Sequence, residues 1–197
     1  MTRDELEALA ISYSHKPELT SDLFDDFFAL AGSRIGRDLK STENETALLA
    51  ETYATNLNAV PSDYGSMRAL EYAKSSGPVN LASRDLASIN DFRASGGDPR
   101  VYLVRARIID IRPFVAGDYN LYYYHRPVLA AGDSSNAVSI TWPNVYLSAL
   151  LVEIQLWAQD QRNLEVARGN YKSEIAETNR EASRSQGDKP AMRKVGR

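Results

Sequence analysis

The chain has 197 residues, 43% hydrophobic and 25% charged, which is typical of a globular protein that buries a sizeable core. No apolar run approaches the roughly 20 residues that a membrane-spanning helix needs, and the lack of cysteine excludes disulfide bonds and thiolate metal sites. The formal net charge of −3 argues against a general nucleic-acid binder, because such proteins neutralise phosphates with an excess of basic residues.

A first helix is predicted over about residues 2–14. Thr2 and Glu5 have the spacing of a capping box, in which each side chain bonds the other residue's backbone N–H. Pro17 ends the helical phase, since a residue before proline is pushed out of the α region. The segment lacks the apolar core of a signal peptide, and the absence of cysteine fits assembly in a reducing cytosol.

A second helix is predicted over about residues 22–40, after the capping candidates Thr20 and Ser21. Its apolar residues recur at spacings of three and four: Phe24, Phe27, Phe28, Ala31, Ile35 and Leu39. Acidic residues near its start and basic residues near its end complement the helix dipole. The dipole explains Asp25 and Asp26 better than a catalytic carboxylate pair does, because adjacent helical positions do not share a face.

The middle of the chain, about residues 44–128, is predicted to be rich in β-strands. Two strands are expected within residues 46–57 and another over residues 67–72. A short helix is expected to begin near Ser83 and to end near Phe92.

A hairpin is predicted from Val101–Val104 and Ile108–Ile111, because the apolar phase slips by one residue across the turn between them. Gly117-Asp118 predicts a further turn. A β-prone strand then runs from Leu121 to Arg126 and stops at Pro127.

Two antiparallel helices are predicted at about residues 143–159 and 162–182, after a loop over residues 130–141. Apolar stripes mark both helices: Leu147, Leu150, Leu151, Ile154, Trp157 and Ala158 in the first, and Leu164, Ala167, Tyr171, Ile175 and Thr178 in the second. The stripes predict that Trp157 is buried between helices and that Glu153 and Gln155 lie on a solvated or partner-facing side.

The C-terminal end is basic. From Arg184 onward five basic residues stand against one acid, a net charge of +4, which leaves −7 on the first 183 residues. A basic, largely polar segment on an acidic body predicts an extended arm that docks elsewhere. Its candidate contact residues are Arg184, Lys189, Met192, Arg193, Lys194, Val195 and Arg197.

Together these elements predict an α+β, mainly α fold. The N- and C-terminal helices would form one antiparallel helical bundle, with the β-rich segment as an insertion between its halves. Residues 1–183 are then one domain, and residues 184–197 are an extended basic C-terminal arm.

No sequence pattern of catalysis or cofactor binding is present: there is no nucleophile elbow, phosphate-binding loop or dinucleotide fingerprint. The two histidines, His15 and His125, would need nearby carboxylates to hold a metal, and nothing in the sequence places them together. We therefore predict a protein that is not an enzyme and that needs no cofactor or metal.

A tyrosine run follows the predicted hairpin. Tyr122, Tyr123 and Tyr124, with Arg126 beside them, are of the type that stacks bases or sugars. Alternation along a strand sends Tyr122 and Tyr124 to one face and Tyr123 to the other, so the three rings do not form one platform. Sheet packing or a subunit interface is the favoured interpretation.

Several segments, taken together, resemble the head-to-tail adaptor proteins of tailed phages. The second predicted helix carries the most characteristic of them, Phe27-Phe28-Ala29-Leu30-Ala31 followed by Arg34-Ile35-Gly36-Arg37-Asp38-Leu39. The others follow in the same order: Val60-Pro61-Ser62-Asp63-Tyr64, Met67-Arg68-Ala69-Leu70-Glu71-Tyr72, Leu121 to Pro127, and Tyr146 to Leu151 followed by Trp157. The resemblance covers most of residues 20–180. It departs from the family pattern at Arg105-Ala106-Arg107, where glycine or asparagine is expected in the turn.

The resemblance implies a structural virion protein at the head–tail junction, assembled in the host cytoplasm. Such proteins form a ring beneath the portal, commonly of twelve copies, through which DNA passes without sequence-specific binding. The implied partners are the portal protein, a tail or nozzle protein and further copies of the chain, and no membrane. The C-terminal arm would dock on the portal. Separately, the outer predicted helices lack a long, uniformly apolar second face, so we expect the isolated protein to be a monomer or small oligomer that forms its ring only on the portal.

Two other functions remain as alternatives. One is a DNA-packaging or nucleic-acid-binding accessory protein that uses the tyrosine run and the basic arm, which a steep salt dependence of DNA binding would reveal. The other is a tail-associated hydrolase, which would need a pair of carboxylates about 5–9 Å apart in a cleft.

Overall fold

A computed structural model describes residues 1–92 and 96–187. The chain divides into two compact units. The helical unit consists of Met1–Asn44 and the part of the chain from Arg126 onward, and the β unit is Glu45–His125. Each unit has a hydrophobic core of its own.

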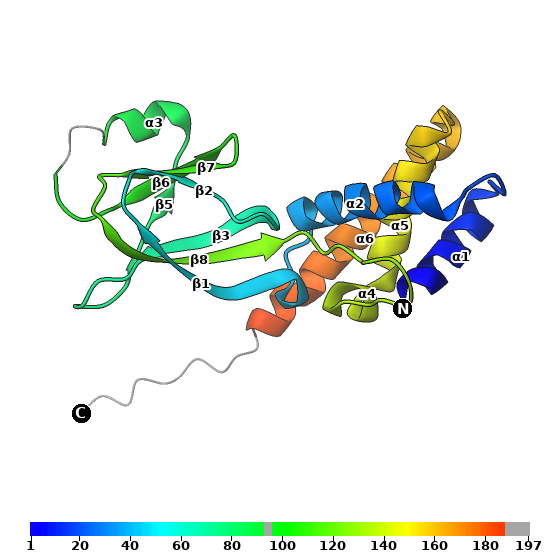
Figure 1. The fold of residues 1–197 in the computed structure, drawn as a ribbon, viewed down its shortest axis with the longest axis horizontal. Helices are drawn as coiled ribbons and strands as arrows, with labels where there is room; N and C mark the ends of the chain where they lie inside the picture. The colour runs from blue at the N-terminus through cyan, green and yellow to red at the C-terminus, as the bar shows by residue number, and fades with distance from the viewer. Residues whose placement is uncertain (93–95, 188–197) are drawn as a thin grey trace. The chain divides into compact units, whose positions relative to one another are not determined.

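The helical unit contains five α-helices and one 3-10 turn among the described residues (Figure 1): α1 (Arg3–Ser14), α2 (Ser21–Asp38), η1 (Thr42–Asn44), α4 (Ala137–Thr141), α5 (Pro143–Trp157) and α6 (Gln161–Gly187). The predicted capping box of α1 is confirmed, since Thr2 accepts from the Glu5 backbone and Glu5 accepts from the Thr2 backbone. The loop predicted over residues 130–141 is wrong at its end. There Asn136 caps the short helix α4 with its own side chain.

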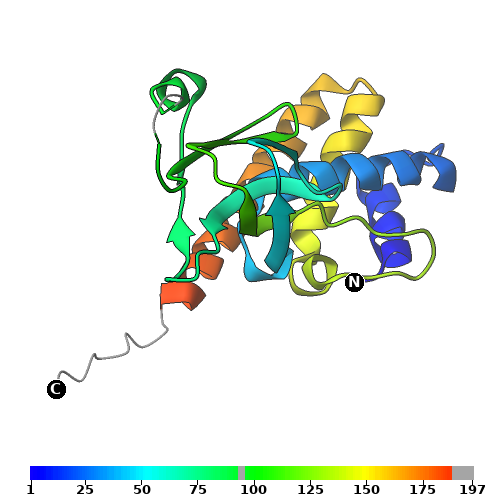
Figure 2. The same ribbon diagram turned by 60° about the vertical axis from the view of Figure 1, so that its left-hand side comes forward.

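Helix α5 is the centre of this unit. Helix α2 crosses it, and α6 runs back alongside it (Figures 1 and 2). Helices cover α5 on several sides, so it buries even Glu153 (7% exposed) and Gln155 (5% exposed). Of the two alternatives predicted for these side chains, a solvated or a partner-facing side, the solvated one is wrong. The predicted stripe of α2 is confirmed. The core combines it with apolar residues of α5, α6 and α1, among them Phe24, Phe28, Ala31, Ile35, Tyr146, Leu150, Ile154, Leu164, Tyr171 and Leu6.

Trp157 lies at the surface, which contradicts its predicted burial. It is the last residue of α5 and is 44% exposed, although its ring still contacts the ring of Phe27 with centroids 6.2 Å apart. The stripe that contains Trp157 continues to the helix end, where the covering helices no longer enclose it. Periodicity alone marks a face of a helix and does not show how far the cover extends.

The β unit holds two four-stranded sheets and one short helix, α3 (Leu86–Asn90), within the described residues. One sheet has the order β1-β8-β3-β4, and the other has the order β2-β7-β6-β5. The strands are β1 (Glu45–Tyr53), β2 (Leu57–Ala59), β3 (Tyr64–Tyr72), β4 (Val79–Asn80), β5 (Ala82–Ser83), β6 (Val101–Arg105), β7 (Ile108–Arg112) and β8 (Gly117–His125).

Strand β8 is a central strand of the first sheet, because β1 and β3 both pair with it in antiparallel orientation. The turn predicted at Gly117-Asp118 is wrong, since these residues begin β8. Side chains from both sheets share one core, which contains Tyr53, Val60, Leu70, Leu81, Tyr102, Ile109, Ile111, Tyr119, Leu121 and Tyr123.

The predicted fold class is therefore wrong. The chain is 46% helical and 23% strand, with six helices and two sheets among the described residues, and it is not a helical bundle with a small insertion. The error has a physical reason. Strand β8 pairs with β1, which is more than sixty residues earlier in the sequence. This pairing gives the middle of the chain a hydrophobic core of its own.

The predicted hairpin is confirmed as β6 and β7, joined by Ala106 and Arg107. Both residues have positive φ, 48° and 62°, as a type I′ turn requires. Neither is glycine or asparagine, so the backbone is strained there. Arg107 compensates by donating from its guanidinium to the carbonyls of Pro61 (3.0 Å) and Ser62 (3.2 Å).

We expect Ala106→Asn to stabilise the β unit by about 0.5–1 kcal/mol, because asparagine tolerates the left-handed conformation and leaves the Arg107 contacts in place. Chemical denaturation measures this change. The control, Ala106→Val, puts a β-branched residue at the same position and should destabilise the unit. An equal response to both substitutions would contradict this account of the turn.

Candidate functional site

The predicted arm lies largely outside the described residues. Helix α6 continues to Gly187, so Arg184 belongs to its last turn and not to an extended segment. Six predicted contact residues fall beyond the part of the chain that the structure describes: Lys189, Met192, Arg193, Lys194, Val195 and Arg197. Residues 188–197 still carry four basic side chains against one acid, a net charge of +3.

The tyrosine run lies on β8. Tyr123 is part of the β-unit core, and its hydroxyl donates to Asp63 (2.9 Å). Tyr122 and Tyr124 project to the other side of the strand, where the Tyr122 hydroxyl donates to Glu71 (3.5 Å) and Tyr124 is only 8% exposed. Arg126 follows the strand end. A role of Tyr122, Tyr124 and Arg126 in a subunit interface stays a prediction.

The two histidines belong to different units. His15 is the C-cap of α1 with a positive φ of 55°, and His125 ends β8. Among residues 1–92 and 96–187, no group of three or more potential ligand side chains is placed to hold a metal ion. No helix in these same ranges has both the length and the apolar character to cross a membrane.

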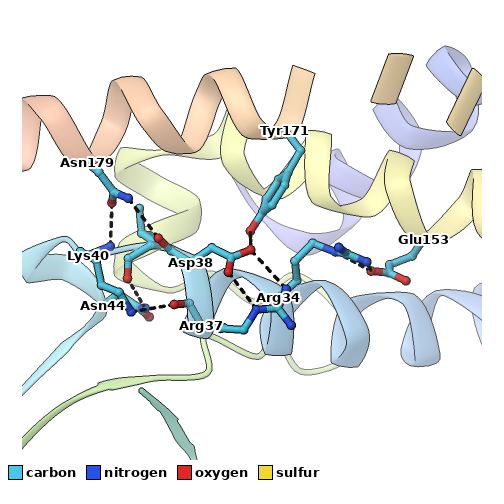
Figure 3. Close-up of polar contacts among 9 residues, drawn as sticks. Arg34, Arg37, Asp38, Lys40, Asn44, Glu153, Tyr171 and Asn179 are labelled. Carbon is cyan, nitrogen blue, oxygen red and sulfur yellow. Dashed lines mark hydrogen bonds and ion pairs between the residues drawn. The ribbon is translucent and has the colours of Figure 1, made fainter. Parts of the chain in front are cut away.

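A buried ion pair fastens α2 to α5 (Figure 3). The Arg34 guanidinium donates to the Glu153 carboxylate from Nε (2.8 Å) and Nη2 (2.6 Å), and the Arg34 side chain also lies over the ring of Tyr171. The Glu153 side chain is only 8% exposed, so this contact compensates a carboxylate that is largely removed from water. The sequence offers one signal, since Glu153 is the only charged residue of α5 and lies between Val152 and Ile154.

A second set of polar contacts fastens the end of α2 to α6 (Figure 3). The Tyr171 hydroxyl donates to Asp38 Oδ2 (3.1 Å), and burial and the neighbouring Asp38 carboxylate raise the pKa of Tyr171. Asn179 bridges the chain after the helix by accepting from the Lys40 backbone (2.7 Å) and donating to the Asp38 carbonyl (3.0 Å). Burial lowers the pKa of the Lys40 ammonium. These bonds connect α2 to both α5 and α6.

The opposite face of α5 forms the floor of a groove, called here the α6 groove. Tyr146 and Glu153 meet α2, whereas Leu147 and Leu151 lie on another face of the helix, below the end of α1 and beside α6. Three hollows of about 360, 320 and 260 Å³ follow one another along α6 and share lining residues. Together they extend from Asn163 to Glu181.

The groove changes character along its length. Its middle is apolar, with Leu147, Leu151 and Ala167 beneath the rim residues Tyr13 and Val166, which are 61% and 59% exposed. Its end near the start of α5 is lined by three carboxylates: Glu174, Glu177 and Glu181. Within the described part of the chain, none of these three carboxylates has an ion-pair partner.

The arrangement supports binding of protein more than chemistry. It combines helices that are joined by buried polar contacts with an open apolar and acidic groove, and Asp25, a candidate for acid–base catalysis, is paired with Arg3. The sequence did not predict the groove, because its lining comes from α1, α5 and α6 and appears only when these helices pack together.

Comparison with known protein families identifies the chain. The family model described as SU10 adaptor protein matches residues 1–194, almost the whole chain. No curated protein matches at the significance required. The family match confirms the resemblance to phage head-to-tail adaptors that begins in the second predicted helix. The chain therefore belongs to the SU10 adaptor protein family, a family of phage head–tail adaptors.

Proposed function

We propose that the protein forms an oligomeric ring that joins the portal of the phage head to the tail and lets DNA pass. The observation that carries this proposal is the family match over residues 1–194. Membership implies a structural, non-enzymatic component of the virion that interacts with head and tail components. We propose in addition that the subunits form a ring of twelve copies, that the partner in the head is the portal protein, and that the partner below is a tail or nozzle protein.

Polar contacts between the helices of the helical unit support this proposal. The Arg34–Glu153 pair and the Tyr171–Asp38 bond tie three helices together through buried polar contacts, which tolerate little displacement. We infer that residues 188–197, with a net charge of +3, dock on an acidic surface of the portal, and that the ring forms only on that template.

The test is attachment to portal-bearing, tailless heads, followed by sedimentation of the heads with bound protein. The full chain should co-sediment, and a variant that ends at Gly187 should lose attachment while keeping its circular dichroism spectrum and melting temperature. Many arms on one ring reinforce each other, so their joint removal should reduce binding by at least about 100-fold.

A matched control removes the same charge elsewhere. Arg162→Gln, Arg168→Gln and Lys172→Gln together delete three positive charges from exposed positions of α6 and leave the arm in place. This variant should attach nearly as well as the full chain. If the truncated chain attaches with unchanged affinity, the arm is not the docking element, and if the full chain never attaches, the adaptor ring itself is wrong.

A further inference from the structure

We propose that, before the portal is engaged, residues 188–197 occupy the α6 groove of their own chain. The inference rests on the proposed function, because it assigns the portal-docking arm a second site in the unassembled subunit. Met192 and Val195 would cover the apolar floor, and the basic side chains between and beyond them would face the carboxylates of the groove.

The length of the arm matches the length of the groove. The groove extends along α6 from Asn163 to Glu181, which is about 27 Å at a rise of 1.5 Å per residue. Ten residues in an extended conformation span about 31–33 Å. The arm starts after Gly187, less than two turns beyond the acidic end of the groove, and glycine is the residue that best permits a chain reversal at a helix end.

The order of residues in the arm matches the order of surfaces in the groove. Counted back from Gly187, Met192 reaches about the level of Glu177, and Val195 reaches about the level of Asn170, above Leu147 and Leu151. In the extended polyproline conformation that a proline such as Pro190 favours, three residues make about one turn, so Met192 and Val195 would lie on the same side.

The opposite charges of the groove and of residues 188–197 also favour these residues as the occupant of the groove. Glu174, Glu177 and Glu181 line one hollow and have no ion-pair partner among the described residues, while the arm brings Lys189, Arg193 and Lys194 to that end. Arginine and lysine donate charge-assisted hydrogen bonds to carboxylates, which strengthen where water is partly excluded.

A buried acceptor at the far end of the groove points to a ligand independently. Gln155 lines the last hollow and is 5% exposed, and its amide oxygen has no hydrogen-bond partner within the described residues. A buried acceptor without a donor costs roughly 1–3 kcal/mol. The end of the arm supplies donors there, both backbone N–H groups and the guanidinium of Arg197.

This contact would couple docking to assembly. The portal and the groove compete for the same ten residues, so a subunit that delivers its arm to the portal uncovers its groove at that moment. The uncovered groove, with its exposed Tyr13 and Val166, is then available to a neighbouring subunit. An unassembled subunit keeps that surface covered, which accounts for a ring that forms only on the portal.

Engineered cysteines test the contact directly, because the native chain has none. The variant Asn170→Cys/Val195→Cys joins the groove to the arm. The control, Lys172→Cys/Val195→Cys, places the first cysteine two residues away on the exposed opposite side of α6. The rate of intramolecular disulfide formation is measured in dilute protein on non-reducing gels, and the test pair should form it at least about tenfold faster than the control.

Charge removal provides a second measurement. Adding Glu174→Gln, Glu177→Gln and Glu181→Gln to the test pair should reduce its disulfide rate several-fold, as should high salt, while the melting temperature stays unchanged. Equal rates for the test and control pairs would overturn the proposal. Disulfide-linked dimers whose yield rises with concentration would also overturn it, and would show that the arm of a second copy fills the groove.

The assay contains no portal, so its outcome is separate from that of the attachment experiment. Equal disulfide rates with normal attachment would refute the groove contact and would leave the proposed adaptor function standing. If the test pair forms its disulfide rapidly but the full chain does not attach to heads, the groove contact is supported and the proposed adaptor function is refuted.

Discussion

Phe28→Ala is expected to lower the free energy of unfolding of the helical unit by about 3–5 kcal/mol. Phe28 is 1% exposed and lies where α2 crosses α5, with its ring 6.2 Å from that of Phe24 and 6.4 Å from that of Tyr146. The Arg3 guanidinium also lies over its face, 4.8 Å from the centroid. Truncation removes these contacts and leaves a cavity that the three packed helices cannot close.

The matched control is Trp157→Ala, which removes a larger aromatic ring from the same interface. Because Trp157 is 44% exposed, much of its surface is already in water, and we expect a loss of only about 1–2 kcal/mol. Denaturant unfolding followed by circular dichroism gives both values. Similar losses for the two variants would mean that α2 does not pack on α5 as described.

Arg34→Met is expected to cost about 3–5 kcal/mol, since it leaves the Glu153 carboxylate buried without its partner. The methionine keeps most of the apolar stem of arginine, so the loss reports mainly on the charge. The double variant Arg34→Met/Glu153→Gln, which removes both charges, should recover at least half of the lost stability.

The same denaturation experiment measures this pair as a double-mutant cycle. Arg37→Met serves as the control. Arg37 pairs with Asp38 at an exposed site, and the hydrogen bond that its guanidinium donates to Asp38 raises the pKa of Arg37, but an exposed pair contributes about 0–1 kcal/mol. If Arg34→Met is as mild as Arg37→Met, the Glu153 carboxylate is hydrated and the ion pair does not hold α2 to α5.

The sequence predicted most reliably those features that depend on neighbouring residues. The Thr2–Glu5 capping box and the stripe from Phe24 to Leu39 are set within one helix, and the structure has both. The hairpin from Val101 to Arg112 depends only on local phase and a short turn. Ala106 shows the limit even there, because a residue without left-handed preference occupies the turn.

Features that depend on distant segments could not be predicted in this way. The pairing of Glu45–Tyr53 with Gly117–His125 gives the β unit its own hydrophobic core. No local sequence pattern predicts which strands pair with each other. Glu153 has the polarity of a surface residue, and only Arg34, 119 positions earlier, makes its burial tolerable.

The two candidate sites show the same difference between local features, which the sequence can predict, and features that depend on packing. The charge of the C-terminal arm is visible in composition, so a docking segment could be proposed from the sequence, and that role stays a prediction; Arg184, which was assigned to the arm, is helical. The α6 groove could not be predicted, because Tyr13, Leu147 and Asn170 line one surface only after three helices have packed.

The most direct test of the adaptor function is electron cryomicroscopy of portal-bearing, tailless heads mixed with the purified protein. The account predicts a closed ring of density at the portal vertex, with one helical unit per subunit and each C-terminal segment in contact with the portal. Portal vertices without added density, at protein concentrations that saturate attachment of a known adaptor in the same preparation, would contradict it.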